Sequence, residues 1–569
     1  MRRQHDDDRQ HNHAHPPRPG ALKAHVAALQ QIQAEARQRQ ERGDAPTEVD
    51  PSRRALAAGL LSALGALALA PGASAAAPAP SQGLSVALAG AGIPWVDSMT
   101  ALRASTYAPR TPLILLQGFA APADGGGGIF CWDATALAAD NNGTIVRPNT
   151  VAPGLPGRWR RMYSGAINAK WFGAGLGAAD DQPVLQALIH FVGSLTGGTI
   201  YLPAGLYRLS APLTINSTNI RILGEGEYCT ALAKAGIDST VFILENANFC
   251  QLANLSLRMQ SGSPSTGSAI LFTKLSTGAL IERISIESMW QGISCGGAVS
   301  TVELPREVVI RDVKMTGILH VGLKLYFALN WKISTCVIGM VFDDQWNGPG
   351  SNHYGVWLDS DSEGCIFDSI FVLGGEHCWR IANSINPAVR GPNEHRFYSC
   401  IGDNGTVSCF YISSLHRALF SSCWASIQKP TSDAAVVLDS LDIWGLVWDT
   451  SQIVNVEGHG IKVIAATSFT VTNSTFSEWG IVPGGWSGIY VYPSPNLTSP
   501  SSTTRSCATP TSCRPRARRW WSARASTTAT SLPTTSATGR RRPWAGAPCR
   551  WPPSTLVPQA LARCGRTTC

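Results

Sequence analysis

Charged residues are scarce in this sequence. Asp, Glu, Lys and Arg make up 15% of its 569 residues, whereas 44% are hydrophobic and the mean hydropathy is +0.01. This balance excludes both a disordered polyelectrolyte and a polytopic membrane protein, and the length excludes a disulfide mini-scaffold. Glycine and proline are plentiful instead, with 55 and 36 residues. Because both favour turns and disfavour helix interiors, we expect a soluble, turn-rich β protein.

Acidic residues and lysine are absent from the last part of the chain. Residues 497–569 contain twelve Arg but no Asp, Glu, Lys, Ile, Asn, Phe, Tyr, Met or His. Without this part, 34 basic and 38 acidic residues remain, and the net charge changes from +8 to −4. The basicity is therefore no evidence for nucleic-acid binding, and none is expected. The composition is typical of an out-of-frame reading of GC-rich coding sequence, so we predict an unstructured, frameshifted tail. An arginine-rich interaction tail is the alternative.

The apolar run at residues 55–70 has only 16 residues, which is short for a membrane span. It follows Arg53-Arg54 and precedes a small-residue cleavage pattern at Ala73-Ser74-Ala75. We therefore predict a polar, partly helical leader at residues 1–51 and a twin-arginine-like export signal at residues 52–80. The body is expected to be secreted or periplasmic, with no stable membrane insertion after signal cleavage. A general secretory signal or an uncleaved anchor is the alternative.

Short β-branched and aromatic runs recur between residues 220 and 491, separated by Gly, Asn, Asp and Ser. They form two interleaved series that share an average period of about 27 residues. The first series is marked by Leu255, Ile284, Val309, Ile333, Ile366, Phe397, Phe420, Leu446 and Val471, and the second by Ile293, Leu323, Val356, Trp379, Phe410, Val436, Ile461 and Ile489. Two strands per period predict a parallel β-solenoid of about nine coils, whereas a propeller blade needs about 40 to 45 residues.

Ten cysteines lie in the body of the chain, without a CxxC pair or a Cys/His group of zinc spacing, so no metal site is expected. Disulfides are usual in an exported protein. The repeat favours free, buried thiols instead. Cys336, Cys400 and Cys423 each follow their marker by three residues, so we expect them to stack as an internal ladder.

The segment before the repeats carries motifs of a known family. Asp180-Asp181 opens a predicted helix, and the stretches GGTIYLPAGLYRLSAPLTI and NIRILGEG follow it. In these motifs the chain resembles the pectate-lyase-like, rhamnogalacturonase/epimerase-type β-helix proteins, which include phage tailspikes and secreted polysaccharide depolymerases. The resemblance covers residues 167–491. Residues 175–179 read GLGAA, where the family commonly has Gly-Asp-Gly.

The resemblance implies an all-β fold, a right-handed single-stranded parallel β-helix of about 9–10 coils over residues 166–496. A short N-terminal helix is expected to cap the first coil, with Asp180 and Asp181 as capping rather than catalytic residues. Residues 81–165 are expected to form a small β-rich neck module in front of the β-helix.

Two polar insertions lengthen consecutive coils and are expected to form the walls of one lateral cleft. Carboxylates one or two coils apart would lie about 5 or 10 Å apart, which suits the separations that retaining and inverting glycosidases need. The candidate catalytic residues are Asp343, Asp344, Asp359, Asp361 and Glu394. The candidate substrate-binding residues are Trp346, as a platform for a sugar ring, His353, Arg380, Arg390 and His395. The alternative for each is a solvated turn residue, because corners require Asp, Asn and Gly.

A solenoid presents aligned side chains over many coils, which suits an extended polymer. Together with the resemblance, this predicts an exported polysaccharide depolymerase, either a glycoside hydrolase or a pectate-type lyase, whose partner is its polysaccharide substrate. No cofactor is expected, except Ca²⁺ if the enzyme is a lyase, and the spikes of the family suggest a homotrimer. The alternatives are a non-catalytic carbohydrate-binding spike or adhesin and an inactive, truncated family member.

Overall fold

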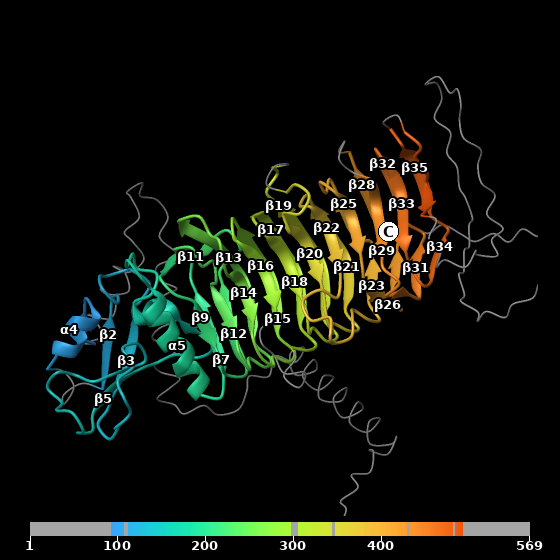
Figure 1. The fold of residues 1–569 in the computed structure, drawn as a ribbon. Helices are drawn as coiled ribbons and strands as arrows, with labels where there is room; N and C mark the ends of the chain where they lie inside the picture. The colour runs from blue at the N-terminus through green and yellow to red at the C-terminus, as the bar shows by residue number, and fades with distance from the viewer. Residues whose placement is uncertain are drawn as a thin grey trace, which may run out of the picture. The chain divides into compact units, whose positions relative to one another are not determined.

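The computed structural model describes residues 93–106, 112–296, 305–343, 347–428, 433–481 and 484–492 (Figure 1). The leader, export signal and tail predicted from the sequence lie outside these residues. No helix in the described ranges is long and apolar enough to cross a membrane.

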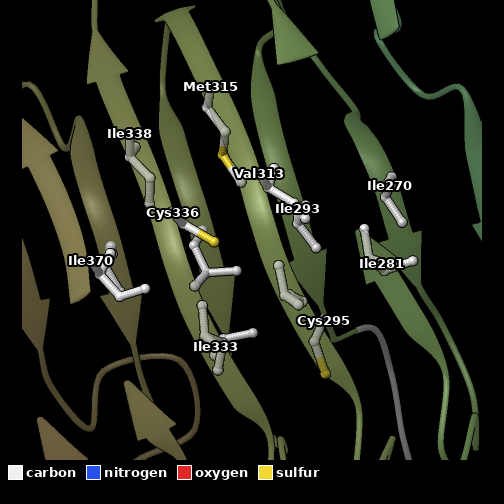
Figure 2. Close-up of a cluster of buried hydrophobic side chains, with 14 of the residues drawn as sticks. Ile270, Ile281, Ile293, Cys295, Val313, Met315, Ile333, Cys336, Ile338 and Ile370 are labelled. Carbon is white, nitrogen blue, oxygen red and sulfur yellow. The ribbon is translucent and has the colours of Figure 1, made fainter. Parts of the chain in front are cut away.

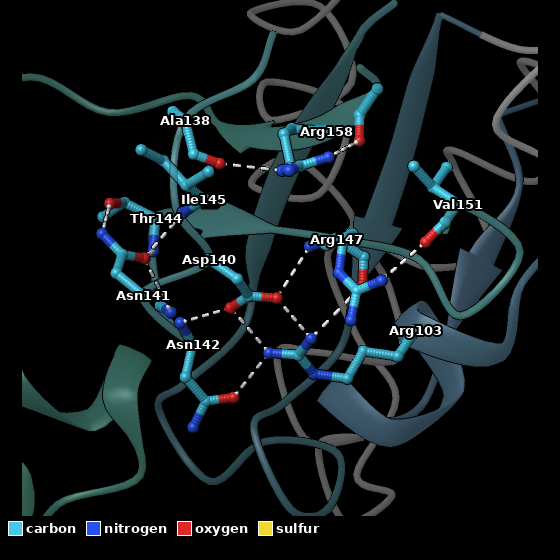
Figure 3. Close-up of polar contacts among 12 residues, drawn as sticks. Arg103, Ala138, Asp140, Asn141, Asn142, Thr144, Ile145, Arg147, Val151 and Arg158 are labelled. Carbon is cyan, nitrogen blue, oxygen red and sulfur yellow. Dashed lines mark hydrogen bonds and ion pairs between the residues drawn. The ribbon is translucent and has the colours of Figure 1, made fainter. Parts of the chain in front are cut away.

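The neck is a five-stranded sheet with one short helix. Its elements are β1 (Trp95–Val96), α4 (Met99–Ala104), β2 (Leu113–Leu116), β3 (Gly128–Asp133), β4 (Ile145–Val146) and β5 (Arg158–Arg161), with strand order β1-β2-β3-β5-β4. Phe130 and Trp159 are fully buried in its core. Asp140 accepts hydrogen bonds from the Arg103 guanidinium and from the backbone N–H groups of Asn142 and Arg147 (Figure 3). This network fastens the loop before β4 to α4.

The rest of the described chain is mainly a parallel β-helix with two long sheets. The first sheet consists of β6 (Ile167–Asn168), β7 (Gly198–Leu202), β8 (Gly205–Leu209), β10 (Ile220–Gly224), β11 (Thr230–Ala235), β13 (Gln251–Ser261), β15 (Leu280–Glu287), β17 (Val309–Ile318), β19 (Lys332–Met340), β21 (Ile366–Leu373), β23 (Arg396–Tyr398), β24 (Ile401–Asp403), β27 (Leu419–Ser421), β28 (Trp424–Ile427), β31 (Leu446–Asp449), β32 (Gln452–Val456), β34 (Phe469–Thr472) and β35 (Thr475–Trp479).

The second sheet has eleven strands, one from each coil, whereas the sequence predicts about nine to ten coils. They are β9 (Leu213–Ile215), β12 (Phe242–Leu244), β14 (Ser268–Phe272), β16 (Gln291–Cys295), β18 (Val321–Leu325), β20 (Tyr354–Leu358), β22 (His377–Ile381), β25 (Ser408–Ile412), β29 (Ala434–Asp439), β33 (His459–Ala465) and β36 (Ile489–Val491). A pair of two-residue strands, β26 (Leu415–His416) and β30 (Ile443–Trp444), belongs to a third, narrow track. Figure 1 shows the strands of successive coils side by side.

The register confirms the second series of the repeat and corrects the first. All eight markers of the second series pair in one row. In the first sheet, however, the row through Ile333 consists of Leu252, Ile281, Ile310, Ile333, Phe367, Phe397, Phe420, Trp448 and Val471. The markers Val309 and Ile366 are therefore one residue off, Leu446 is two residues off, and Leu255 and Ile284 are three residues off. The error arose because first-sheet strands carry buried residues in two halves, and a sequence run can be aligned on either half.

A column of residues in the left-handed backbone conformation separates these two halves. Its members stack through successive coils with φ between 48° and 59°: Asn254, Arg283, Asp312, Thr335, Ser369, Ser399, Ser422, Thr450 and Asn473. A residue with positive φ breaks the alternation of an extended strand and turns the chain. The strands β13, β15, β17, β19 and β21 are therefore bent at this residue, and in the later coils it separates β23 from β24, β27 from β28, β31 from β32 and β34 from β35.

The core is a continuous stack of buried side chains along the coils (Figure 2). Phe367, Phe397 and Phe420 stack nearly parallel, with ring centroids 4.9 and 4.2 Å apart. All ten described cysteines are free, as predicted. The predicted thiol ladder is only partly right, because Cys400 and Cys423 occupy equivalent positions but Cys336 pairs with Ile370. A β-branched residue therefore interrupts the row.

The predicted cap is α5 (Gln182–Ser194), which buries Leu185, Leu188, Ile189 and Val192 against the first coils. Asp180 accepts a hydrogen bond from the backbone N–H of Gln182 at 3.0 Å and one from the hydroxyl of Ser210 at 2.6 Å. Asp181 accepts from the backbone N–H groups of Gly175 and Arg208. The two aspartates therefore fasten the start of the cap to the loop before it and to the end of β8.

Candidate functional site

The two insertions lie at opposite ends of the second-sheet strands. Residues 341–353 precede β20, whereas residues 382–395 follow β22, the neighbouring strand. Because the strands are parallel, the insertions flank the outer face of the sheet on two sides. We call residues 347–353 the first wall and residues 382–392 the second wall.

Asp359 fastens the second wall. Its carboxylate is fully buried and accepts six hydrogen bonds of 2.6 to 3.0 Å. The donors are the indole N–H of Trp357, the backbone N–H and hydroxyl of Ser360, the backbone N–H and hydroxyl of Ser384, and the backbone N–H of Ile385. Because this carboxylate is buried and both its oxygens are occupied by these donors, the geometry supports a positioning role for this catalytic candidate.

Glu376 fastens the first wall in the same manner. It is 7% exposed, and its two carboxylate oxygens accept hydrogen bonds from the backbone N–H groups of Gly350 and Asn352, each at 2.7 Å. The hydroxyl of Ser351 is 3.4 Å away. Two buried carboxylates from neighbouring coils thus fix the two sides of the same face.

Between the walls, the outer face carries a row of alternating cations and aromatic rings, which we call the floor: Lys324, Trp357, Arg380 and Tyr411. They pair in register through β18, β20, β22 and β25, and each is the half-exposed fourth residue of its strand. The Lys324 ammonium lies 4.7 Å from the Trp357 ring centroid. The Arg380 guanidinium lies 5.8 Å from Trp357 and 5.5 Å from Tyr411. Cation–π attraction holds the row together.

The two floor cations lack anionic partners. Within the described residues, neither Lys324 nor Arg380 forms a hydrogen bond or an ion pair through its side chain, and the Nε of Arg380 is buried without a partner. Burial lowers the pKa of Lys324, although nearby Asp359 opposes this effect. Such half-buried, uncompensated cations favour the approach of an anionic group.

Two further rings support the floor. His377 lies parallel to the Tyr411 ring at 4.7 Å and to the Tyr354 ring at 5.7 Å. Burial, reinforced by Arg380, lowers the pKa of His377 to about 3. Burial also raises the pKa of Tyr354 to about 12, and burial together with a hydrogen bond to Asp439 does the same for Tyr411. At neutral pH His377 is therefore uncharged, and both tyrosines remain protonated.

A carboxylate pair lies beyond the second-sheet strands, beside the second wall. The Nη2 atom of Arg390 is 2.5 Å from Glu363 Oε2 and 3.8 Å from Asp361 Oδ1. These carboxylate oxygens are consequently no more than about 6.3 Å apart, the limit that the two distances set. The side chains of Asp361 and Glu363 are 21% and 31% exposed. The pair is therefore accessible to solvent.

The other candidates lie at different places. Glu394 forms an exposed ion pair with Arg417 at 3.0 Å on the third track. His395 is fully buried, where it accepts a hydrogen bond from the Cys365 backbone N–H and contacts the Ser362 carbonyl oxygen. His353 is almost buried, in an edge-on row with His320. Asp343 is exposed near the start of the first insertion, and Asp344 and Trp346 lie outside the described residues.

Sequence reasoning placed Arg380 on the site but missed Lys324, Trp357 and Tyr411. Their signal was present in the second series, because GLKL, GVWL, CWRI and CFYI place these residues at one equivalent, outward position. The prediction concentrated on loops, whereas the floor lies on strands. In the described ranges, no group of three or more His, Cys, Asp and Glu side chains is placed to hold a metal ion.

Comparison with known protein families divides the chain into the same two parts as the structure, the neck and the β-helix. Residues 95–164 match the model for the phage tail protein small four-stranded β-sheet domain. Residues 166–387 match the model for rhamnogalacturonase A/epimerase, pectate lyase-like proteins. The β-helix is thus similar to this pectate-lyase-like family over residues 166–387. The matched part includes both fastening carboxylates and the floor from Lys324 to Arg380.

Curated relatives share only a short stretch with this chain. Mannuronan C5-epimerase AlgE3 of Azotobacter vinelandii is 45% identical over 110 residues, or 19% of this chain and 5% of the epimerase. AlgE1 of the same organism is 47% identical over 79 residues, or 14% of this chain and 5% of the epimerase. The chain thus spans about a twentieth of the length of these relatives.

Solved structures with a similar course include a tailspike and an epimerase module. The tailspike gp49 of Acinetobacter baumannii bacteriophage Fri1, a capsular polysaccharide depolymerase, has a TM-score of 0.47 at 14% identity, covering 70% of this chain and 74% of the tailspike. The A-module of mannuronan C-5 epimerase AlgE6 from Azotobacter vinelandii has a TM-score of 0.41 at 13% identity, covering 57% of this chain and 99% of the module.

Proposed function

We propose that this protein binds an acidic polysaccharide along the outer face of the second sheet and cleaves it. The observation that carries the proposal is the pair of unpartnered cations, Lys324 and Arg380, set between aromatic rings on one exposed row. Aromatic faces stack on sugar rings, and the cations pair with sugar carboxylates. Residues two coils apart lie about 10 Å from each other, so the floor suits several consecutive sugars of an extended chain.

The composition of the floor favours β-elimination over hydrolysis. Elimination at a uronate transfers the proton beside the carboxylate to a base and breaks the bond to the neighbouring oxygen, leaving an unsaturated sugar. Solvent water at this half-exposed face would take that proton, and Arg380 would stabilise the charge that develops on the carboxylate. The protonated Tyr411 would turn its hydroxyl away from Asp439 and donate a proton to the leaving oxygen. The described carboxylates near the floor already accept hydrogen bonds: Asp359 from its six donors, Glu376 from the first wall and Asp439 from the Tyr411 hydroxyl.

Hydrolysis is a second candidate because of the carboxylate pair beside the second wall. The upper limit of about 6.3 Å between Asp361 and Glu363 allows the separation of about 5 to 5.5 Å that retaining glycosidases use. In this arrangement Arg390 would have to move away before either group could meet a sugar. Asp343, Asp344, Glu394 and Trp346 remain candidates for contacts with the polymer outside the floor.

Export to the periplasm or the cell exterior and assembly as a homotrimer belong to the proposal as well. Export rests on the signal at residues 52–80, and the homotrimer rests on the family resemblance. Detection of the processed body outside the cytoplasm and its molar mass by light scattering test these two points.

The test uses the full chain against sodium polygalacturonate, alginate and hyaluronan, with dextran and pullulan as neutral controls. We expect binding to acidic polymers only, together with absorbance from unsaturated products. Release of reducing ends without that absorbance would identify hydrolysis, and binding without either product would identify a non-catalytic module. Equal binding to the neutral polymers would overturn the proposal.

A matched pair of variants locates the site. Arg380→Met removes the unpartnered floor cation, and we expect it to weaken binding of the acidic polymer about ten- to a hundredfold, since a charge-assisted hydrogen bond is lost. Lys314→Gln removes a cation from the first sheet, where it pairs with Glu227 at 2.6 Å, and should leave binding unchanged. Equal effects of the two substitutions would show that the floor is not the site.

A further inference from the structure

The arrangement around Arg380 recurs farther along the same face. In the first instance, His377 Nδ1 contacts the Ser408 hydroxyl at 2.8 Å, and the His377 ring stacks on Tyr411 at 4.7 Å with an interplanar angle of 15°. Ser408 and Tyr411 pair with His377 and Arg380 on the next coil. The cation Arg380 is the third residue after the histidine.

The second instance uses equivalent positions. His459 Nδ1 accepts a hydrogen bond from the Ser487 backbone N–H at 3.0 Å, and the His459 ring stacks on Tyr490 at 4.4 Å with an interplanar angle of 10°. Tyr490 pairs with Lys462, and Lys462 is again the third residue after the histidine. Trp486 adds an edge-on ring 5.0 Å from His459. Histidine, serine, cation and tyrosine therefore recur in the same relative places.

The two clusters lie in one row. Arg380 pairs with Tyr411, Tyr411 with Val437 and Val437 with Lys462, so Lys462 lies three coils beyond Arg380. At about 4.8 Å per coil this separation is about 14 Å. The intervening Val437 adds no charge to the row.

Burial is the largest factor that lowers the pKa of His459, as it is for His377, so both rings are neutral at neutral pH. The cation of each cluster consequently supplies its positive charge. Lys462 is paired with Asp433, whose side chain is 49% exposed. The Lys462 side chain is 21% exposed, and a carboxylate of a ligand could replace the half-exposed Asp433 as its partner.

We propose that His459, Lys462 and Tyr490 form a second subsite for the acidic polymer, three coils beyond the subsite at Arg380. The ligand class is a chain of carboxylated sugars long enough to reach both cations. Tyr490 provides the ring and Lys462 the charge, while His459 positions Tyr490. This inference rests on the proposed function, because it requires that the floor bind an acidic polymer.

The test measures how affinity depends on ligand length. The probes are a disaccharide and a dodecasaccharide prepared from polygalacturonate or from alginate, whichever polymer the full chain binds. We expect Lys462→Gln to weaken dodecasaccharide binding about two- to fivefold, the range for loss of an exposed charge contact, and to leave disaccharide binding unchanged. Tyr490→Leu should act in the same direction, and Lys314→Gln is the matched control.

Each outcome separates the inference from the proposed function. If wild-type protein binds neither acidic polymer, the proposed function fails. If wild-type protein binds them but Lys462→Gln behaves like Lys314→Gln, only the second subsite is refuted. An equal loss for the two oligomer lengths also refutes it, because a general structural defect does not depend on ligand length. Melting temperatures of the variants identify such a defect.

Discussion

Asp359 accepts two hydrogen bonds from Ser384, one from the backbone N–H at 2.9 Å and one from the hydroxyl at 2.7 Å. The two residues are 25 positions apart in sequence and belong to successive coils. The neighbouring Ile385 N–H donates to the same carboxylate. Together these hydrogen bonds hold the second wall in place. The shape of the proposed site thus depends on a group that solvent does not reach.

Replacing this group tests its positioning role. In Asp359→Asn the new NH₂ group would face at least one N–H or O–H group that now donates a hydrogen bond to the carboxylate. That group would lose its acceptor, and we expect a loss of roughly 3 kcal/mol in the free energy of unfolding. Hydrogen exchange measured by mass spectrometry should accelerate at residues 384–386. Asp368→Asn is the control, since Asp368 is exposed on the first sheet. Unchanged protection of the second wall would contradict the role.

Buried histidines should make the fold sensitive to acid. Burial lowers the pKa of both His377 and His395 to about 3, whereas histidine in the unfolded chain titrates near 6.5. Between these values the unfolded chain binds more protons than the native protein. The free energy of unfolding should therefore fall as pH decreases from about 6.5 towards 3, by a few kcal/mol per histidine.

Urea unfolding at several pH values measures this slope. His395→Gln should make the dependence on pH shallower even if it lowers stability at every pH. His190→Gln, on the exposed side of the cap helix, should leave the slope as it is. A slope that is the same in all three proteins would show that His395 does not titrate as proposed.

The floor should lose affinity for acidic polymers at moderately alkaline pH. Burial lowers the pKa of Lys324, so its charge is lost below the pH at which an ordinary lysine, with a pKa near 10.5, titrates. Because the charged form pairs with sugar carboxylates, binding should weaken as pH rises through that lowered value. Lys324→Arg should keep its charge and retain binding.

Lys314 supplies the comparison for this titration. Its hydrogen bonds to Glu227 and Tyr228 raise its pKa, and it lies on the first sheet. Lys314→Arg should therefore not change how binding depends on pH. Identical pH profiles for wild type and Lys324→Arg would argue against a contribution of Lys324.

Thiol labelling should follow burial. Cys229 is exposed and Cys131 is half-buried, whereas the other eight described cysteines are buried. Burial, together with the neighbouring thiols Cys423 and Cys378, raises the pKa of Cys400 and Cys409 well above the usual value. Iodoacetamide should therefore alkylate Cys229 first in the native protein, and Cys400 and Cys409 only after unfolding. Peptide mapping by mass spectrometry reads each position, and early labelling of Cys400 would contradict its burial.

Much of the fold could be predicted from residues that act locally. Asp180-Asp181 followed by an apolar helical run indicated the cap. Gly-Ile-Lys-Val and the equivalent segments of the second series indicated strands with one outward and several inward positions. The first series was harder, because Val309 and Ile310 are adjacent apolar residues and the sequence does not say which one pairs with Ile333. The bent strand has two inward-facing halves, and a sequence run can be aligned on either one. Such an error in alignment leaves the average period nearly unchanged.

The sequence by itself determined the period, the two strand tracks, the cap and the low net charge of the body, because these follow from the spacing and type of neighbouring residues. Only the tertiary structure decided which side chains face one another across coils. Asp359 and Glu376 look like solvated turn residues in the sequence, yet the fold buries both among donors from adjacent coils. Lys324 and Arg380, 56 positions apart, lie on one row beside aromatic rings. Stacking distance and the presence or absence of a counter-charge depend on the register between coils, which no local pattern specifies.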